Sequence, residues 1–296
     1  MVLEKIQKIT QYIQTLPVLP AVMSKLLDLF HDPDTSASDI EKLVSSEPAL
    51  SAKILKLANS SFYGCPNEIV SVKHAVSMLG FNNIMNLALS ISIVKKFKAE
   101  FSSARFDLFK FWEHSLQCGI TAKKIALETN LNDSNELFTI GILHDIGKLI
   151  IYEYVNAEYE KIEKLRKRER LSSVVAEKKI LGTDHAEIGY WLCKNWNLPE
   201  QIGLSILYHH DCLNAEKFKK ISFILHFSDY LVNKYLTPFP DDNFAELSDP
   251  DKARDELNLK YCIVSGGKKI IDWDYYNELM VEELENSKEF LQLFKI

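Results

Sequence analysis

The chain has 296 residues, of which 47% are hydrophobic, and its 41 acidic and 35 basic residues leave a net charge of -6. This composition supplies a packed core and disfavours the broad basic surface that nucleic-acid binding needs. The five cysteines are widely spaced without a C-x-x-C pair, so we expect a reducing compartment and neither a disulfide framework nor a thiolate zinc cluster. The longest apolar stretch, roughly Leu87 to Val94, is too short to cross a bilayer. We therefore expect a soluble, cytoplasmic protein without a membrane or nucleic-acid partner.

Apolar residues recur at steps of three and four through most of the chain, and this spacing predicts an all-α fold. In chain order, the signals that predict helix starts are Pro20, a capping box at Ser38-x-x-Glu41, Pro48 and Pro199. Two glycines, Gly64 and Gly80, are each expected to end a helical stretch.

These helices are expected to form two packed bundles, the first over residues 1–100 and the second over residues 101–236. The seam between the bundles is expected near Phe97 to Phe106. Residues 237–296 open with TPFPDDNFAELSDPDKARDE, whose Pro, Asp and Asn content predicts an irregular acidic connector. A last helix is expected after the connector, from about Trp273 to Phe294.

Histidines concentrate in the second bundle, where five of the eight lie between positions 114 and 210. Each is expected on the apolar face of its own helix, where an unpaired polar ring is costly to bury. A single such ring is more often a core histidine bonded to a backbone carbonyl. Several together favour a metal site built from facing helices. The expected inward-facing set is His114, His144, Asp145, His185, His209, His210 and Asp229.

The adjacent pair His144 and Asp145 is the most specific local signal. Neighbours about 100° apart on one helix can both reach a metal if that helix passes the ion tangentially. Lys148 follows on the same side, where its ammonium would orient a phosphate or stabilise a leaving oxygen. Spacing alone is equally compatible with a solvated lysine near a helix C-terminus. Three other histidines are expected to stay outside the ligand set: His31, His74 and His226.

The segment GILHDIGKL, Gly141 to Leu149, resembles the His-Asp doublet of HD-domain phosphohydrolases. The segments Asp184 to Ile202 and Tyr208 to Asp211 resemble the HD-GYP branch, whose members hold two or three metals. The resemblance implies that the HD ligands are His114, His144, Asp145 and Asp229, and that the added ligands are His185, His209 and His210.

This sequence departs from the HD-GYP pattern at two places. Lys110 stands where some trinuclear members have a glutamate ligand, which disfavours a third metal. After His210 the sequence has no glycine and no Gly-Tyr-Pro loop, so the cyclic-di-GMP substrate of that branch is not transferred to this chain.

The N-terminal third is most similar to another family, the HD-related output domain (HDOD), a bacterial signalling module often joined to response regulators. Three segments carry this resemblance: LPVLP at Leu16 to Pro20, Ser45 to Gly64, and Ser71 to Leu89. It covers about residues 10 to 230. Many HDOD members have lost metal ligands, whereas this sequence retains the whole set.

The function expected from these observations is that of a signalling module with an HD-type site for one or two divalent transition metals, acting through a partner protein. Iron or manganese is favoured, with zinc or nickel as alternatives, because the ligands are imidazoles and carboxylates. The alternative is an active metal-dependent phosphohydrolase on a nucleotide or cyclic dinucleotide, in which Asp145 and Lys148 are catalytic. A scaffold without metal is disfavoured by the coherence of the ligand set.

Overall fold

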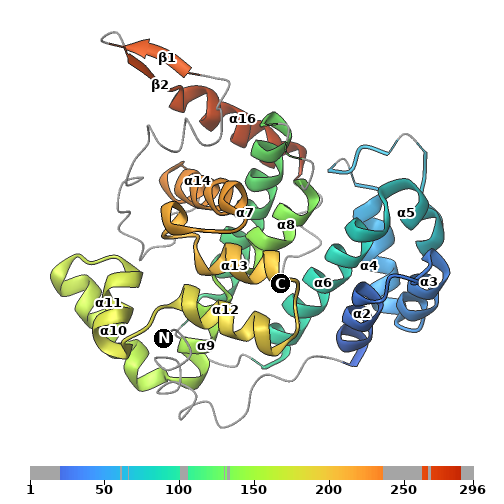
Figure 1. Ribbon diagram of the computed structural model, residues 1–296, viewed down its shortest axis with the longest axis horizontal. Coiled ribbons are helices and arrows are strands. Elements are labelled where there is room, and N and C mark those ends of the chain that lie inside the picture. Colours follow the sequence, from blue (N-terminus) through green and yellow to red (C-terminus); the bar gives the residue numbers. More distant parts are fainter. Residues whose placement is uncertain are drawn as a thin grey trace. The chain divides into compact units, whose positions relative to one another are not determined.

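The computed structural model describes residues 21–60, 62–65, 67–100, 106–129, 131, 134–235, 262–265 and 268–287 (Figure 1). The described residues fall into two compact units, and the chain passes from the first to the second between Glu113 and His114, within one helix. Both units are built from helices, which confirms the predicted all-α class. No helix of the described residues is long and apolar enough to span a membrane.

The first unit contains helices α2 to α6, with bounds Ala21–His31, Ala37–Ser45, Pro48–Ala58, Val72–Leu79 and Phe81–Glu100. Its core is apolar, and Met23, Ile40 and Ile54 are fully buried in it. Pro48 is the first residue of α4, as predicted, since a proline there loses no helical hydrogen bond. Gly80 ends α5 with a φ of 89°, a backbone conformation that side chains with a Cβ rarely adopt.

Two predicted boundaries in this unit are wrong by a few residues. The capping box lies at Ser36 instead of Ser38, because the Asp39 carboxylate accepts a hydrogen bond of 3.1 Å from the Ser36 backbone N–H. Both serines have a carboxylate three residues later, so the sequence pattern alone does not choose between them. Helix α4 ends at Ala58, well before Gly64, with Asn59 as its C-cap.

The second unit contains most of α7 and the helices from α8 to α14. Their bounds are Leu108–Glu128 for α7, Ser134–Leu143 for α8, Ile146–Tyr154 for α9, Asn156–Glu169 for α10, Ser173–Leu181 for α11, His185–Asn195 for α12, Glu200–Leu207 for α13 and Lys219–Tyr235 for α14, with a short 3-10 turn at Cys212–Asn214. Pro199 is the N-cap of α13, close to the start that the sequence predicts.

Glycines allow two pairs of helices in this unit to approach very closely. A Cβ on Gly141 of α8 would lie 2.4 Å from the Gly119 Cα of α7. A Cβ on Gly147 of α9 would lie only 1.9 Å from the His185 carbonyl oxygen of α12. Any larger residue at these positions would push the paired helices apart. The glycines therefore keep α7, the α8–α9 segment and α12, which all carry candidate ligands, close to one another.

The C-terminal part contains the one described departure from helical structure. Strands β1 (Cys262–Ser265) and β2 (Lys268–Ile271) pair antiparallel, with Cys262 opposite Ile271. No strand is predicted in this part of the chain, although short β-branched stretches around Gly266-Gly267 are a recognised hairpin signal.

Helix α16 (Trp273–Asn286) begins where the last helix is predicted. The Tyr276 ring packs edge-on against Phe227 of α14, so this part of α16 docks on the second unit. The predicted acidic connector and the predicted end of the last helix lie outside the described residues.

Candidate metal centre

The structure brings all seven predicted site residues together in the second unit, in two adjacent groups. The first group is His114, Cys118, His144 and Asp229, and the second is Asp145, His185, His209 and His210. Within each group, one potential ligand atom per residue lies within 4.8 Å of the others. Seven of these eight residues are buried, and His210 is partly buried.

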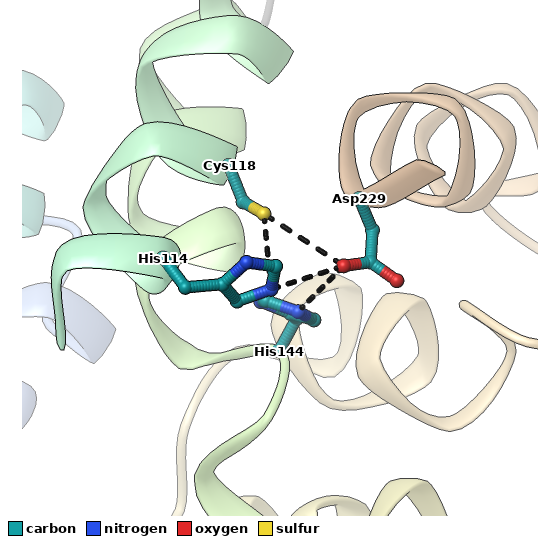
Figure 2. A group of neighbouring side chains, drawn as sticks. All are labelled: His114, Cys118, His144 and Asp229. Carbon is teal, nitrogen blue, oxygen red and sulfur yellow. Dashed lines mark hydrogen bonds and ion pairs between the residues drawn. The ribbon is translucent and has the colours of Figure 1, made fainter. Parts of the chain in front are cut away.

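The first group is formed by α7, α14 and the turn after α8 (Figure 2). His114 and Cys118 lie one turn apart on α7, and Asp229 faces them from α14. The Asp229 Oδ1 lies 3.1 Å from His114 Nε2 and 3.6 Å from His144 Nε2. Two imidazoles and a thiol therefore converge on one carboxylate oxygen.

The second group is formed by the start of α12 and the turn after α13. His185 Nε2 lies 3.2 Å from Asp145 Oδ1 and 2.8 Å from His210 Nε2. His209 Nε2 is 3.7 Å from the same oxygen of Asp145. Three imidazoles thus surround the Oδ1 side of this carboxylate.

Asp145 lies between the two groups and presents one oxygen to each. Its Oδ2 faces the first group, at 3.3 Å from His144 Nε2 and 3.9 Å from His114 Nε2. The Lys148 Nζ donates a hydrogen bond of 2.8 Å to this Oδ2, and the lysine is 8% exposed. A carboxylate in this position has the geometry of a bridge between two cations.

Three of the histidines are oriented by hydrogen bonds from the nitrogen that faces away from the cluster. The Nδ1 of His144 lies 2.7 Å from a backbone carbonyl oxygen of α8, and that of His209 lies 2.6 Å from one of α13. The Nδ1 of His185 lies 2.7 Å from the Glu177 carboxylate of α11. A carbonyl oxygen can only accept, so His144 and His209 each carry a proton on Nδ1 and direct Nε2 inward.

Several inward-facing atoms have no hydrogen-bond partner within the described chain. They are His144 Nε2, His209 Nε2 and Asp145 Oδ1, and all three are buried. Buried polar atoms whose hydrogen bonds are not made within the chain cost about 1–3 kcal/mol each. Divalent cations that displaced the protons on these imidazoles would contact all three atoms.

The charge balance of the cluster favours a cation as well. Burial alone lowers the pKa of His144, but Asp145 and Asp229 outweigh it and raise that pKa to about 10. Burial acts likewise on His185, where the Glu177 carboxylate is the main cause that raises the pKa to about 10. Burial raises the pKa of Asp145, yet His144 and Lys148 hold it well below the ordinary value. Asp145 thus remains ionised and attracts positive charge to the centre.

The remaining two histidines of the second group are in a different electrostatic environment. Burial lowers the pKa of His209. Burial and the neighbouring imidazoles His209 and His185 lower the pKa of His210 well below its ordinary value. Neutral imidazole is the form that binds metals, so these two rings are ready to do so.

The local structure around the ligands differs from the prediction. His144 and Asp145 do not lie on one helix; they form the turn between α8 and α9, and Asp145 is the N-cap of α9. His185 is the first residue of α12, and His209 and His210 follow the end of α13 instead of lying on a helix face. In this turn His144 belongs to the first group, while Asp145 presents one oxygen to each group.

Sequence reasoning missed two residues of the centre. Cys118 is four residues after His114 and therefore on the same face of α7, but a cysteine on an apolar face usually indicates packing alone. Glu177 is 4% exposed and belongs to another helix than its partner His185, so no local spacing indicates it. His226 lies in neither group, but its Nδ1 donates to the His209 carbonyl at 2.7 Å.

Comparison with solved structures shows the same fold elsewhere. The chain is similar to an HDOD domain protein of unknown function from Geobacter sulfurreducens, with 25% identity, a TM-score of 0.75, and coverage of 99% of this chain and 97% of that one. A proposed phosphohydrolase from Shewanella amazonensis SB2B has the same fold at 24% identity, with a TM-score of 0.73 and coverage of 97% and 98%.

Sequence comparison gives a curated relative and a family. An uncharacterized protein from Treponema pallidum (strain Nichols) is 25% identical over 229 residues, which are 76% of this chain and 43% of that protein. The chain thus spans less than half the length of this relative. The HDOD domain family matches residues 16–212. Because this match covers more than half of the sequence, the chain belongs to the HDOD domain family.

Proposed function

We propose that the chain is a cytoplasmic signalling module that holds two divalent transition-metal ions, one in each ligand group, and acts through a partner protein. The observation that carries the metal part is the orientation of His144, His185 and His209. Each has its Nδ1 fixed by an acceptor outside the cluster, and each turns its Nε2 towards the centre. This arrangement is typical of metal-binding histidines.

The ligands suit ions of intermediate hardness. Imidazole and carboxylate together favour iron or manganese, with zinc or nickel as alternatives, over calcium. Asp145 would bridge the two ions through its two oxygens, and Lys148 would neutralise part of the charge on Oδ2. The number of ions in this proposal follows from the two groups of ligand atoms.

The partner part of the proposal rests on family membership and on the first unit. Helices α2 to α6 supply no residue to either ligand group, so catalysis does not account for their presence. Two apolar side chains are exposed to solvent in this unit, Val70 just before α5 by 73% and Met78 of α5 by 45%. We propose that the first unit presents a surface of this kind to a signalling protein.

The second candidate function is metal-dependent hydrolysis of a phosphate ester, in a nucleotide or a dinucleotide. Bound divalent ions would supply a hydroxide near neutral pH. Lys148 favours this activity, because a buried ammonium beside Asp145 is placed to bind a phosphoryl oxygen. The name of the Shewanella protein points to the same chemistry.

Metal content tests the main proposal. The full chain would be purified without chelator, supplied anaerobically with iron(II) or manganese(II), desalted and examined by elemental analysis. We expect bound metal in the unmodified chain and in His226→Ala, and a clear loss in His144→Ala. His226 is the matched control, since it is a nearby histidine of the same unit outside both groups. Absence of metal from the unmodified chain would contradict the proposal.

A further inference from the structure

Cys118 is the one thiol in the two ligand groups of the described chain. It is fully buried on α7. Its Sγ lies 3.5 Å from His114 Nε2 and 3.8 Å from Asp229 Oδ1 (Figure 2). The sulfur therefore points to the same space as the imidazoles and the carboxylate of the first group.

A buried cysteine usually acts as a small apolar side chain. Cys193 of α12 has this role in the same unit, because it is 2% exposed and belongs to neither ligand group. Cys118 differs from it, since its sulfur faces a ring nitrogen and a carboxylate oxygen. Apolar packing does not explain why the thiol is directed at the most polar place in the core.

The separations within the first group fit a tetrahedral ion. With bonds of about 2.3 Å to sulfur and about 2.0–2.2 Å to nitrogen and oxygen, tetrahedral ligands lie about 3.6 Å apart when one is sulfur and about 3.4 Å apart otherwise. The observed separations are 3.5 and 3.8 Å for the sulfur, and 3.1 and 3.6 Å between Asp229 and the two imidazoles. These four separations fit one ion, and the ligand atoms of all four residues lie within 4.8 Å of one another.

We propose that Cys118 is the fourth ligand of the ion in the first group, so that this position selects a thiophilic metal such as zinc, cobalt(II) or iron(II). The second group contains no sulfur and keeps only nitrogen and oxygen ligands. When the ion binds, the S–H bond breaks, a sulfur–metal bond forms and the proton passes to solvent. The two positions thus differ in their metal preference. This inference rests on the proposed metal centre.

Cobalt(II) is the probe that distinguishes the ligands, because a thiolate bound to cobalt(II) gives intense charge-transfer absorption in the near ultraviolet. The full chain, Cys118→Ser and Cys193→Ser would each be titrated anaerobically, with bound cobalt measured in parallel. We expect the absorption in the unmodified chain and in Cys193→Ser, and none in Cys118→Ser. We also expect Cys118→Ser to bind cobalt at the first position at least ~10-fold more weakly while the second position still fills.

Three results would overturn the inference in different ways. Cobalt bound to the unmodified chain without the charge-transfer absorption would show that the centre exists but that Cys118 is not a ligand. The unmodified chain alone decides this, whether or not the serine variant folds. No bound cobalt in the unmodified chain would overturn the metal centre and this inference with it. The same absorption in Cys118→Ser would assign the sulfur to another cysteine and contradict the proposal.

Discussion

Gly147→Ala tests whether helix packing sets the geometry of the metal centre. The new Cβ would lie 1.9 Å from the His185 carbonyl oxygen, whereas real contacts of this kind are not shorter than 3.0 Å. Helices α9 and α12 would therefore separate by at least 1.1 Å, the difference between these two distances. The contacted atom is backbone, so no side-chain rotation can relieve the clash. Overpacking of this kind costs about 1–3 kcal/mol, more than the roughly 1 kcal/mol of helix propensity that alanine gains over glycine.

The same displacement would disturb the ligands. His185 Nε2 now lies 3.2 Å from Asp145 Oδ1, and metal sites tolerate errors of only about 0.2 Å in their bond lengths. We therefore expect Gly147→Ala to lower both the urea midpoint of the metal-free protein and the metal affinity of the second group.

Gly203→Ala is the matched control for this experiment. Its Cβ would meet the Tyr190 ring at 3.2 Å, and a ring edge can shift. We expect this variant to unfold at or above the midpoint of the unmodified chain and to bind metal normally. The reasoning would be refuted if Gly147→Ala matched Gly203→Ala in both urea unfolding and metal titration calorimetry.

Three other predictions follow from the same cluster. Glu177→Gln should weaken metal binding about 10–100-fold in calorimetry, because the amide holds the His185 ring less firmly, while the exposed Glu169→Gln changes nothing. Equal affinity of both variants would exclude an orienting role for Glu177. In the metal-free protein, His144 and His185 have folded pKa values of about 10, above the unfolded value of about 6.5. Their stabilisation is complete below pH ~6.5 and is lost as the pH rises towards ~10, so the urea midpoint should fall across this window. A constant midpoint there would contradict the assigned protonation. Metal-loaded protein should hydrolyse cyclic-di-GMP far below ordinary enzyme rates of about 1 per second, because the Gly-Tyr-Pro element is absent. Fast turnover that Asp145→Ala abolishes would instead establish the hydrolase function.

The sequence by itself determined the fold class, many of the helices and the residues that gather at the centre. Apolar spacing predicted helices because a helix must bury one stripe of its surface. Pro48 indicated a helix start because its φ is fixed, and Gly80 indicated a helix end because glycine adopts a positive φ easily. The seven polar residues were predicted from their expected places on apolar helix faces, although only His114, His185 and Asp229 belong to helices and the other four lie in turns. An imidazole or a carboxylate at such a position needs a partner in the core.

Only the tertiary structure decided how these residues divide into two ligand groups and which neighbouring residues orient their side chains. Spacing along the chain cannot show that Asp145 presents one oxygen to each group, because that depends on the turn between α8 and α9 and on the contact of Gly147 with α12. Glu177 and Cys118 enter the centre through distances between separate helices, to His185 and to Asp229. Such contacts arise from packing between elements, which local periodicity does not encode. The helical pattern of the sequence thus specifies which side chains face inward, and the close approach of particular backbones specifies which of them meet.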